Sequence, residues 1–520
     1  MTNSPDIEPS PPRRQRWLPS VSVMLWLVFF LALNLSAARV KMIASDADPC
    51  WHWQQGNWML QHHAILRTEI FSHTRAGAPL VDLWWLSEIV TALAGNLLGW
   101  GGIVLVASVV CATIPWLVHR QLLAEGNELL LSTLLTLLAM AECATHWLAR
   151  PHLATQLMVV VFVWQLRWFD LGRTTARQLL VLLPLLMALW VNLHGAFIVG
   201  FVLIGVYLAG AVVNWVCATG EERPTFRHRA TVLVALGTAC SLASLLNPNG
   251  WELPVQVVRY TTNPLMMGFT QEFLPPNFHD IDTLPFVIVL VVTLLLLLIA
   301  RPHLNVTDKL LLIAWLVLSL RMARNETVFA LVVTPILAEH WNAYLRTAAP
   351  SRMLRRYREI STRLTAVDQM AGARGLPVLA VIAMIAVLAK PQLFGGPPLL
   401  ATELPASRFP VAAVKFLRRS PDVVHDEMFN DYTWGGYFTL AMPERKVFFH
   451  PIVLVYGEEV IRDFLRVDEV QPGWEAVLKK YHVGWTILPR EHRLNRLLAQ
   501  RVDWRLVYTD PVATIYGRIP

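Results

Sequence analysis

From Val21 to His63 the sequence reads "VSVMLWLVFFLALNLSAARVKMIASDADPCWHWQQGNWMLQHH", an apolar run followed directly by a polar segment rich in tryptophan. The run is apolar as far as Ala38 and follows the basic segment "PPRRQRW". A solvated loop would not need so much tryptophan, and a buried span would not tolerate the two aspartates of residues 45–63. The sequence therefore predicts a retained first span without a signal-peptide cleavage site, followed by a segment that lies on the membrane surface.

The composition extends this interpretation to most of the chain. Of 520 residues, 55% are hydrophobic and 16% are charged, whereas soluble domains hold about 25% charged residues. The mean hydropathy is +0.45, and apolar runs of about sixteen to twenty-four residues recur as far as Lys390. We therefore expect a polytopic α-helical membrane protein with about eleven transmembrane helices, centred near residues 30, 110, 138, 162, 185, 206, 237, 292, 314, 335 and 383.

The arginines give the predicted spans an orientation, because cytoplasmic loops collect basic residues. With a cytoplasmic N-terminus, the inner loops hold most of the arginines, and the first long loop and the tail lie on the outer side. Membrane topology thus explains the net charge of +7 better than a nucleic-acid partner does. The arginines assigned to inner loops are Arg13, Arg14, Arg16, Arg167, Arg173, Arg177, Arg223, Arg227, Arg229, Arg346, Arg352, Arg355, Arg356, Arg358, Arg363 and Arg374.

This topology predicts two domains: a transmembrane domain over residues 1–391 and an α/β domain on the outer face over residues 392–520. The first outer loop, residues 40–100, contains "CWHWQQGNWMLQHH" and "VDLWWLSEIVTALAGNLLG", which we expect to be interfacial helices. In the tail, the patterns predict helices at "PVAAVKFLRR", "GWEAVLKKYH" and "RLNRLLAQR", strands at "KVFFHPIVLVY" and "GWTILP", and a hairpin at "WRLVYTDPVATIYGR". The five cysteines show no CxxC spacing, so neither a zinc site nor a disulfide framework is predicted.

Polar side chains gather at the predicted outer ends of the spans. Singly, such residues often only reach toward headgroups or cap a helix. Together they indicate a cavity, because ionisable groups near the hydrocarbon boundary are costly. An acid there can act as general base, and arginines can hold a phosphate leaving group, which describes transfer of a sugar from a lipid phosphate. The candidates are Asp46, Asp48, Trp51, His52, Arg150, His152, His194, Glu272, Arg321, Arg324 and Asn325.

Several short motifs follow one another in a fixed order. They are "DADPCWHWQQGNWML", "VDLWWLSEI", "NLHGAF", "LLNPNGW", "EFLPPNF", "RMARN" and "YTWGGYF", and they span the chain from Asp46 to about Tyr516. In this order, and in its acids after the first span, the chain resembles the GT-C superfamily of integral-membrane glycosyltransferases. More narrowly it is similar to a group of bacterial GT-C-like proteins. It departs from them at "FFHPIVLVYG", where relatives tend to carry an Asp-Gly-Arg-like step.

This resemblance implies an inverting glycosyltransferase of the bacterial inner membrane, with a polyprenyl-phosphate sugar as donor and an acceptor glycan, lipid or protein on the outer side. The catalytic base maps onto Asp46 or Asp48, and the sequence leaves the choice open. Arg150, Arg321 and Arg324 are expected to bind the phosphate. Some GT-C enzymes use a divalent metal held by the loop acids, but the sequence shows no full set of ligands. The remaining candidates, expected to line the substrate pocket, are Trp51, His52, His152, His194, Glu272 and Asn325.

Two other functions stay open at this point. A transporter of lipid-linked sugars would also place charged groups in a membrane cavity, but near the mid-plane and often on repeated, broken helices, and no internal repeat is visible. A non-catalytic assembly protein could keep the GT-C scaffold and bind partners through its outer domain, because a fold does not fix a function. The position of Asp46 and Asp48 separates the enzyme from the scaffold: an enzyme needs them in a cavity shared with the arginines.

Overall fold

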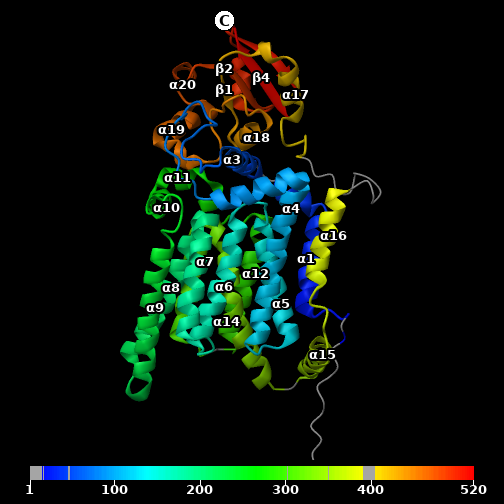
Figure 1. Cartoon of the computed structure of the whole chain (residues 1–520), viewed down its shortest axis with the longest axis vertical. Helices are drawn as coiled ribbons and strands as arrows, with labels where there is room; N and C mark the ends of the chain where they lie inside the picture. The colour runs from blue at the N-terminus through cyan, green and yellow to red at the C-terminus, as the bar shows by residue number, and fades with distance from the viewer. Residues whose placement is uncertain are drawn as a thin grey trace, which may run out of the picture.

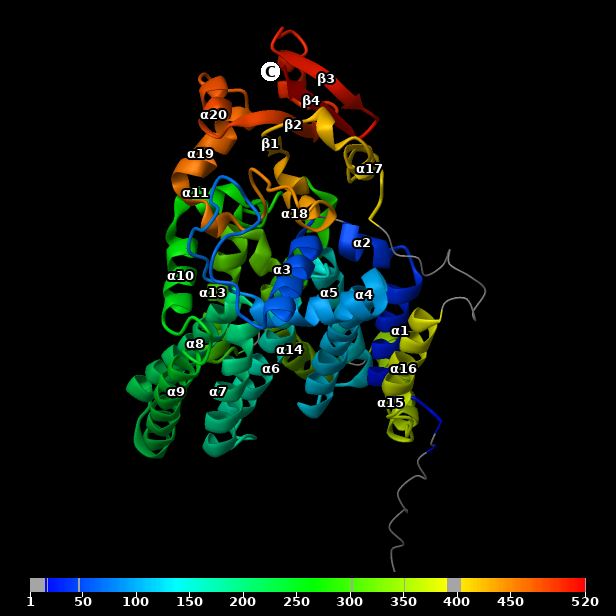
Figure 2. The ribbon, with the colours of Figure 1, turned by 45° about the horizontal axis from the view of Figure 1, so that its top comes forward.

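The computed structural model describes residues 15, 17–44, 47–300, 303–349, 351–390 and 404–519, so Asp46 lies outside the described residues. A long helical bundle carries a small sheet-containing part at one end, and the C-terminus lies at the far side of that part (Figure 1). Figure 2 shows α3 and the first arm of α4 lying between the bundle and the sheet.

Each predicted span centre falls inside a helix. By length and composition, six helical segments of the described chain could cross a membrane, and two shorter helices, α1 and α16, are also apolar. Both groups are rich in Leu, Val, Ile and Ala, which gives them their high hydropathy. The helices that contain the centres are α1 (Val21–Leu35), α4 (Trp85–Ala124), α5 (Leu129–Cys143), α6 (His152–Asp170), α7 (Ala176–Leu193), α8 (Ile198–Cys217), α9 (Arg223–Ala243), α12 (Leu284–Leu295), α13 (Val306–Arg321), α14 (Glu326–Thr347) and α16 (Leu376–Ala389).

Helix α4 is bent, and the bend separates an interfacial arm from a spanning arm. Leu98 and Gly99 leave the helical region, and Gly99 has a φ of 60°, which a side chain disfavours. Just beyond, a Cβ on Gly102 would lie 2.2 Å from the carbonyl oxygen of Ala94, so only glycine permits the turn. The arm before the bend lies across the end of the bundle (Figure 1), as the pattern of residues 81–99 predicts.

Helix α3 (Asp48–His62) packs directly on this arm. A Cβ on Gly56 would lie 2.1 Å from the carbonyl oxygen of Glu88, so the two helices touch backbone to backbone there. Trp53 covers Gly95 and donates through Nε1 to Asn96. The helix predicted for "CWHWQQGNWMLQHH" is therefore also present, and it packs against the first arm of α4.

The C-terminal part is built on a four-stranded sheet with the order β1-β2-β4-β3. Strands β1 and β2 are parallel, and the other two pairs are antiparallel. The predicted strand at residues 484–489, the closing hairpin and the three predicted helices are present. The elements are α17 (Val411–Arg419), β1 (Glu427–Asn430), α18 (Tyr432–Ala441), α19 (Gly457–Asp468), α20 (Trp474–Lys480), β2 (Val483–Pro489), α21 (Arg493–Leu498), β3 (Trp504–Thr509) and β4 (Ala513–Arg518).

The strand predicted for "KVFFHPIVLVY" is wrong. Val447 makes a single bridge to Ser72 of the first long loop, and its N–H donates to Phe71 O at 2.9 Å. Pro451 then removes a donor, and a 3-10 turn follows at Val453–Val455. The apolar pattern is nevertheless satisfied, because the segment is buried between the sheet and the first loop. Strand β1 and helix α18, which contains the whole of "YTWGGYF", were not assigned from the sequence.

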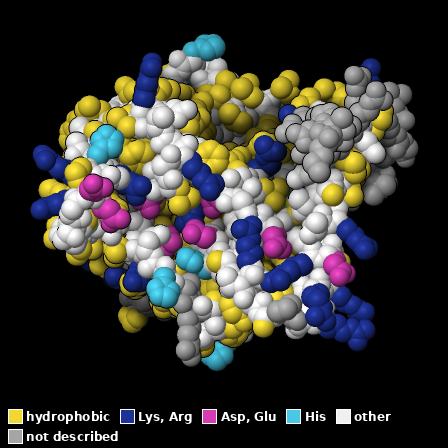
Figure 3. All heavy atoms as spheres, turned by 90° about the horizontal axis from the view of Figure 1, so that it is seen from below, with side chains coloured by type: hydrophobic (Ala, Val, Ile, Leu, Met, Phe, Trp, Pro, Cys, Tyr) yellow, Lys and Arg dark blue, Asp and Glu magenta, His cyan; other side chains and the backbone are white. Residues whose placement is uncertain are grey.

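At the end of the bundle opposite the sheet, basic side chains are common (Figure 3). Arg173, Arg177, Arg223 and Arg227 are exposed there, in line with the predicted loops. Arg167, predicted in a loop, is instead inside α6 and buried. The reason is charge pairing, since its guanidinium contacts three carboxylates from other helices, those of Glu125, Asp308 and Glu339.

Candidate active site

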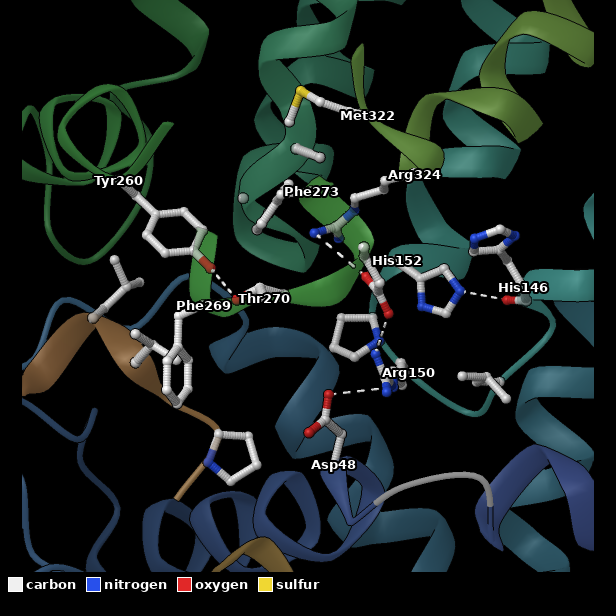
Figure 4. A pocket seen from close by; sticks show the side chains of 18 of the residues that line it. Asp48, His146, Arg150, His152, Tyr260, Phe269, Thr270, Phe273, Met322 and Arg324 are labelled. Atoms are coloured by element: carbon white, nitrogen blue, oxygen red, sulfur yellow. Dashed lines mark hydrogen bonds and ion pairs between the residues drawn. The ribbon is translucent and has the colours of Figure 1, made fainter. Parts of the chain in front are cut away.

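A cavity of about 1390 Å³ lies where the bundle meets the C-terminal part. Six stretches far apart in sequence build its wall: the start of α3, the turn before α6, the α7–α8 junction, the loop after α10 (Glu252–Thr262), the α13–α14 junction and the tail. Figure 4 shows side chains from several of these stretches pointing toward one another. The polar ends of the spans therefore do converge, as the sequence predicts.

Arg150 joins two carboxylates in this cavity. Its Nε lies 3.2 Å from Asp48 Oδ2, and its Nη1 donates to Glu272 Oε1 at 2.8 Å (Figure 4). Trp51 Nε1 donates to the other oxygen of Asp48 at 3.1 Å. Asp48 stands in the first turn of α3, so these contacts orient a carboxylate that lines the cavity.

Glu272 lies between two arginines. Besides Arg150, its second oxygen has Arg324 Nη1 at 4.0 Å. Burial raises the pKa of Glu272, but the charges of Arg150 and Arg324 outweigh it, and the pKa falls to about 2. Arg324 in turn donates through Nη2 to His194 Nε2 at 2.9 Å and lies 5.4 Å from the Phe273 ring centroid. The two guanidinium groups thus share one anion in the described structure.

Such a pair of arginines is suited to a phosphate group. Guanidinium forks hold planar or tetrahedral oxyanions through two hydrogen bonds each, and they stabilise charge that develops on a leaving oxygen. Glu272 occupies the place of that anion, held by both arginines. A phosphate that enters the cavity would share or replace its contacts.

A network of buried polar groups supports the cavity wall behind α3. His52 Nδ1 lies 3.0 Å from Glu88 Oε1, and both side chains are almost fully buried. Further round the wall, His194 Nδ1 lies 2.8 Å from Thr155 Oγ1, to which Trp190 donates. The histidines and hydroxyls of the wall are therefore held by neighbours and not free to turn.

The other sides of the cavity are apolar or belong to the tail. Apolar side chains from α8 and α13, among them Val199, Val202 and Leu318, line the part within the bundle. From the tail come Tyr432 and Trp434, together with further polar residues of the C-terminal part. These two aromatic residues were not predicted as site residues. The motif "YTWGGYF" could have indicated them, because tyrosine and tryptophan side chains often bind sugars or lipid at an interface.

Most of the predicted site residues line the cavity. Arg321 is exposed at the end of α13 and does not line the cavity, although Arg324 follows three residues later and does. Asp46 lies outside the described residues. His146, from the same end of a predicted span as Arg150 and His152, also lines the wall, and its carbonyl oxygen accepts from His152 Nε2 at 2.6 Å. The predicted residues that the structure brings together around the cavity are Asp48, Trp51, His52, Arg150, His152, His194, Glu272, Arg324 and Asn325.

The described residues of the site do not fit a divalent metal. Within the described ranges, no group of three or more His, Cys, Asp or Glu side chains is placed to hold one. Asp48 and Glu272 approach each other only through the guanidinium of Arg150, whose positive charge takes the position that a cation would need. No step of the chemistry considered below passes through a metal.

No protein-family model and no curated protein matches the sequence. Among solved structures, the apo oligosaccharyltransferase of Archaeoglobus fulgidus matches with a TM-score of 0.55 at 13% identity, over 92% of this chain and 71% of that chain. The oligosaccharyltransferase AglB of the same organism, in complex with an inhibitory peptide and a dolichol-phosphate, matches with a TM-score of 0.56 at 13% identity, over 96% and 74%. Apo ArnT from Cupriavidus metallidurans gives a TM-score of 0.48 at 13% identity, over 96% and 98%. At these identities the two archaeal structures show a shared fold.

Proposed function

We propose that this chain, which has the fold of the GT-C glycosyltransferases, is an enzyme that transfers a sugar from a polyprenyl-phosphate donor to an acceptor at the membrane surface. One observation carries the proposal. Arg150 and Arg324 converge on a single anionic position in a cavity that also receives Asp48. A binding scaffold has no need for this arrangement, whereas a phosphate leaving group next to a general base requires it.

The chemistry follows from the positions of the charges. Asp48, in the first turn of α3, or Asp46, two residues earlier in the sequence, takes the proton from a hydroxyl of the acceptor, and the oxygen attacks the anomeric carbon of the sugar. The bond between that carbon and the phosphate oxygen breaks, and the electron pair leaves with the phosphate. Arg150 and Arg324 stabilise the resulting charge, and a single displacement inverts the anomeric configuration.

The apolar wall of the cavity supports a lipid-linked donor. Val199, Val202 and Leu318 line it from helices within the bundle, so a polyprenyl chain can remain among apolar side chains while its phosphate reaches the arginines. One of the archaeal structures with the same fold holds a dolichol-phosphate. The arginine distribution supports an inner-membrane location with the cavity and tail on the periplasmic side.

The test is turnover by the purified full chain in lipid nanodiscs, with a panel of radiolabelled polyprenyl-phosphate sugars. Sugar release by the wild type is compared with release by Asp46→Asn and Asp48→Asn. Glu221→Gln, at an exposed position remote from the cavity, serves as the matched control. We expect one of the first two variants to lose turnover by more than a hundredfold while it still binds the donor.

Two outcomes would contradict the proposal in different ways. Full turnover in both aspartate variants would overturn the assignment of the base but keep the enzyme. Failure of the wild type to bind or cleave any donor of the panel would overturn the transferase and favour the non-catalytic scaffold.

A further inference from the structure

The imidazole of His52 is held in one orientation. Its ring lies against that of Trp51 with 3.5 Å between centroids and an interplanar angle of 36°, and Trp84 packs edge-on against it at 5.8 Å. Its side chain is 3% exposed. A ring so enclosed cannot turn over without moving a tryptophan, so the two nitrogens keep their positions.

One of these nitrogens, Nδ1, is bound to a buried carboxyl. Glu88 Oε1 lies 3.0 Å from it, and the Glu88 side chain is fully buried. With its amide nitrogen facing this carboxyl, Gln55 donates to both oxygens at 2.9 Å each.

Glu88 fixes the tautomer of His52. Gln55 donates to both oxygens of Glu88, so both oxygens act as acceptors, and Oε1 therefore accepts from Nδ1 of His52. His52 therefore carries its own proton on Nδ1.

The second nitrogen, Nε2, is then an acceptor at the cavity. His52 lines the cavity wall, and no side chain or backbone group among the described residues donates to Nε2. Burial, followed by the charges of Arg150 and His152, lowers the pKa of His52 well below its ordinary value, so the ring is neutral. A histidine that served only the core would have both nitrogens satisfied. The free acceptor faces the same space as Asp48, one turn earlier on α3.

We propose that His52 is a specificity-determining residue: its Nε2 accepts a hydrogen bond from a hydroxyl that the substrate carries close to the reacting centre. The hydroxyl belongs to the transferred sugar or to the acceptor, and Glu88 and Gln55 act as positioning residues that keep Nε2 unprotonated. The inference rests on the proposed function and adds the chemical group that the site selects. A substrate without this hydroxyl leaves the buried acceptor Nε2 unpaired. The site should therefore bind and convert such a substrate much less well than one that carries the hydroxyl.

The first arm of the test examines the tautomer without any substrate. The ring carbon Cδ2 has a different carbon-13 shift in the two neutral tautomers of histidine, and the His52 signal is identified by its loss in His52→Phe. We expect the Nδ1–H form in the wild type and a mixed or inverted form in Glu88→Gln, whose amide can donate to Nδ1. The Nε2–H form in the wild type would overturn the proposal.

The second arm measures selectivity with deoxy analogues. Polyprenyl-phosphate sugars that lack one ring hydroxyl each, and acceptors that lack one hydroxyl each, are compared with the parent compounds. For one analogue we expect kcat/KM of the wild type to fall roughly ten- to a hundredfold. In His52→Phe, which keeps the ring between the tryptophans, that difference shrinks to about twofold. Whether the sensitive analogue is a donor or an acceptor identifies the source of the hydroxyl.

His62→Phe is the matched control, because His62 ends the same helix, is exposed and does not line the cavity. It should keep the selectivity of the wild type. Equal kcat/KM for all analogues, or selectivity unchanged in His52→Phe, would overturn the role of His52 and leave the transferase intact. If no donor of any kind binds or reacts, the proposed function fails and the role of His52 fails with it.

Discussion

At the scale of the residue, the site depends on which member of a motif reaches the cavity. "LRMARNE" contains two arginines three residues apart, but α13 ends at Arg321 and a 3-10 turn, Ala323–Asn325, redirects the chain. Arg324 therefore lines the cavity and meets His194, while Arg321 stays exposed. Position in the turn, and not residue type, separates the two.

This difference gives a matched pair of variants. Arg324→Gln removes a charged donor from the anionic position, and we expect the apparent affinity for polyprenyl phosphate to fall roughly ten- to a hundredfold. Arg321→Gln, with the same change of charge outside the cavity, should alter affinity by about twofold or less. Binding of polyprenyl phosphate to nanodiscs measures both. Equal losses would show that the membrane surface, and not the cavity, provides the attraction.

A second pair of residues fastens the tail to the first loop. Glu69 and His450 are fully buried 3.1 Å apart, and Glu69 also accepts from the backbone N–H groups of Phe71 and Ser72. The histidine of "FFHP" therefore has a structural role here, because His450 is the partner of a first-loop acid. Burial raises the pKa of Glu69, but His450 and the two N–H groups outweigh it, and the pKa lies below its ordinary value.

The lowered pKa of Glu69 makes the stability of the folded protein depend on pH. A carboxyl whose pKa is lower in the folded state adds stability above its unfolded pKa of about 4.3, and this stability is lost as the pH falls toward the folded value. We expect the thermal midpoint of the wild type to drop more between pH 7 and pH 4 than that of Glu69→Gln, which is less stable at pH 7 because breaking the buried pair costs about 3–5 kcal/mol. Thermal unfolding followed by tryptophan fluorescence measures this. The exposed Glu491→Gln is the control, and a parallel pH dependence in Glu69→Gln would contradict the assignment.

At the scale of the element, α3 is positioned by glycines on both sides. Gly56 lets it touch α4, and Gly436 of α18 lets the tail touch its start. A Cβ on Gly436 would lie 2.6 Å from the carbonyl oxygen of Ala47 and 2.8 Å from Trp51 Cδ1. The helix that presents Asp48 is thus clamped between the bundle and the C-terminal part.

Gly436→Val should push α18 away from α3 and disturb Asp48 without unfolding either part. We expect turnover to fall at least about tenfold, because a small misplacement of reacting groups is costly. Hydrogen exchange at residues 47–52 should rise in the same variant. Gly375→Ala, where nothing lies within 4 Å of the added Cβ, is the control. Unchanged exchange and turnover in Gly436→Val would show that α3 holds its place without the tail.

At the scale of the whole molecule, the charge distribution and the position of the sheet give one orientation. Arginines gather at the end where α15 (Arg352–Gln369) lies, opposite the sheet (Figure 1). We expect Val502→Cys, at a 94% exposed position of the tail, to react with a membrane-impermeant maleimide in spheroplasts. Met353→Cys, 81% exposed on α15, should react only after lysis. Both are made with the exposed Cys217 replaced by serine. The reverse pattern would invert the topology.

The sequence by itself determined what depends on local composition. Apolar runs place a helix at every expected span centre, and the tryptophan-rich segments of the first loop form the two helices that their patterns predict, because both signals act within one or two turns. Polar residues at the ends of the spans also indicated the cavity. Their type was enough for this, since a buried charge must find a partner.

The tertiary structure decided everything that depends on partners distant in sequence. Arg167 is buried inside α6 because three other helices bring carboxylates to it, and "KVFFHPIVLVY" is no strand because the first loop, some 370 residues earlier, covers it. The tautomer of His52 likewise depends on Glu88, on a different helix. Such contacts are set by the packing of the whole chain, and no local pattern encodes them.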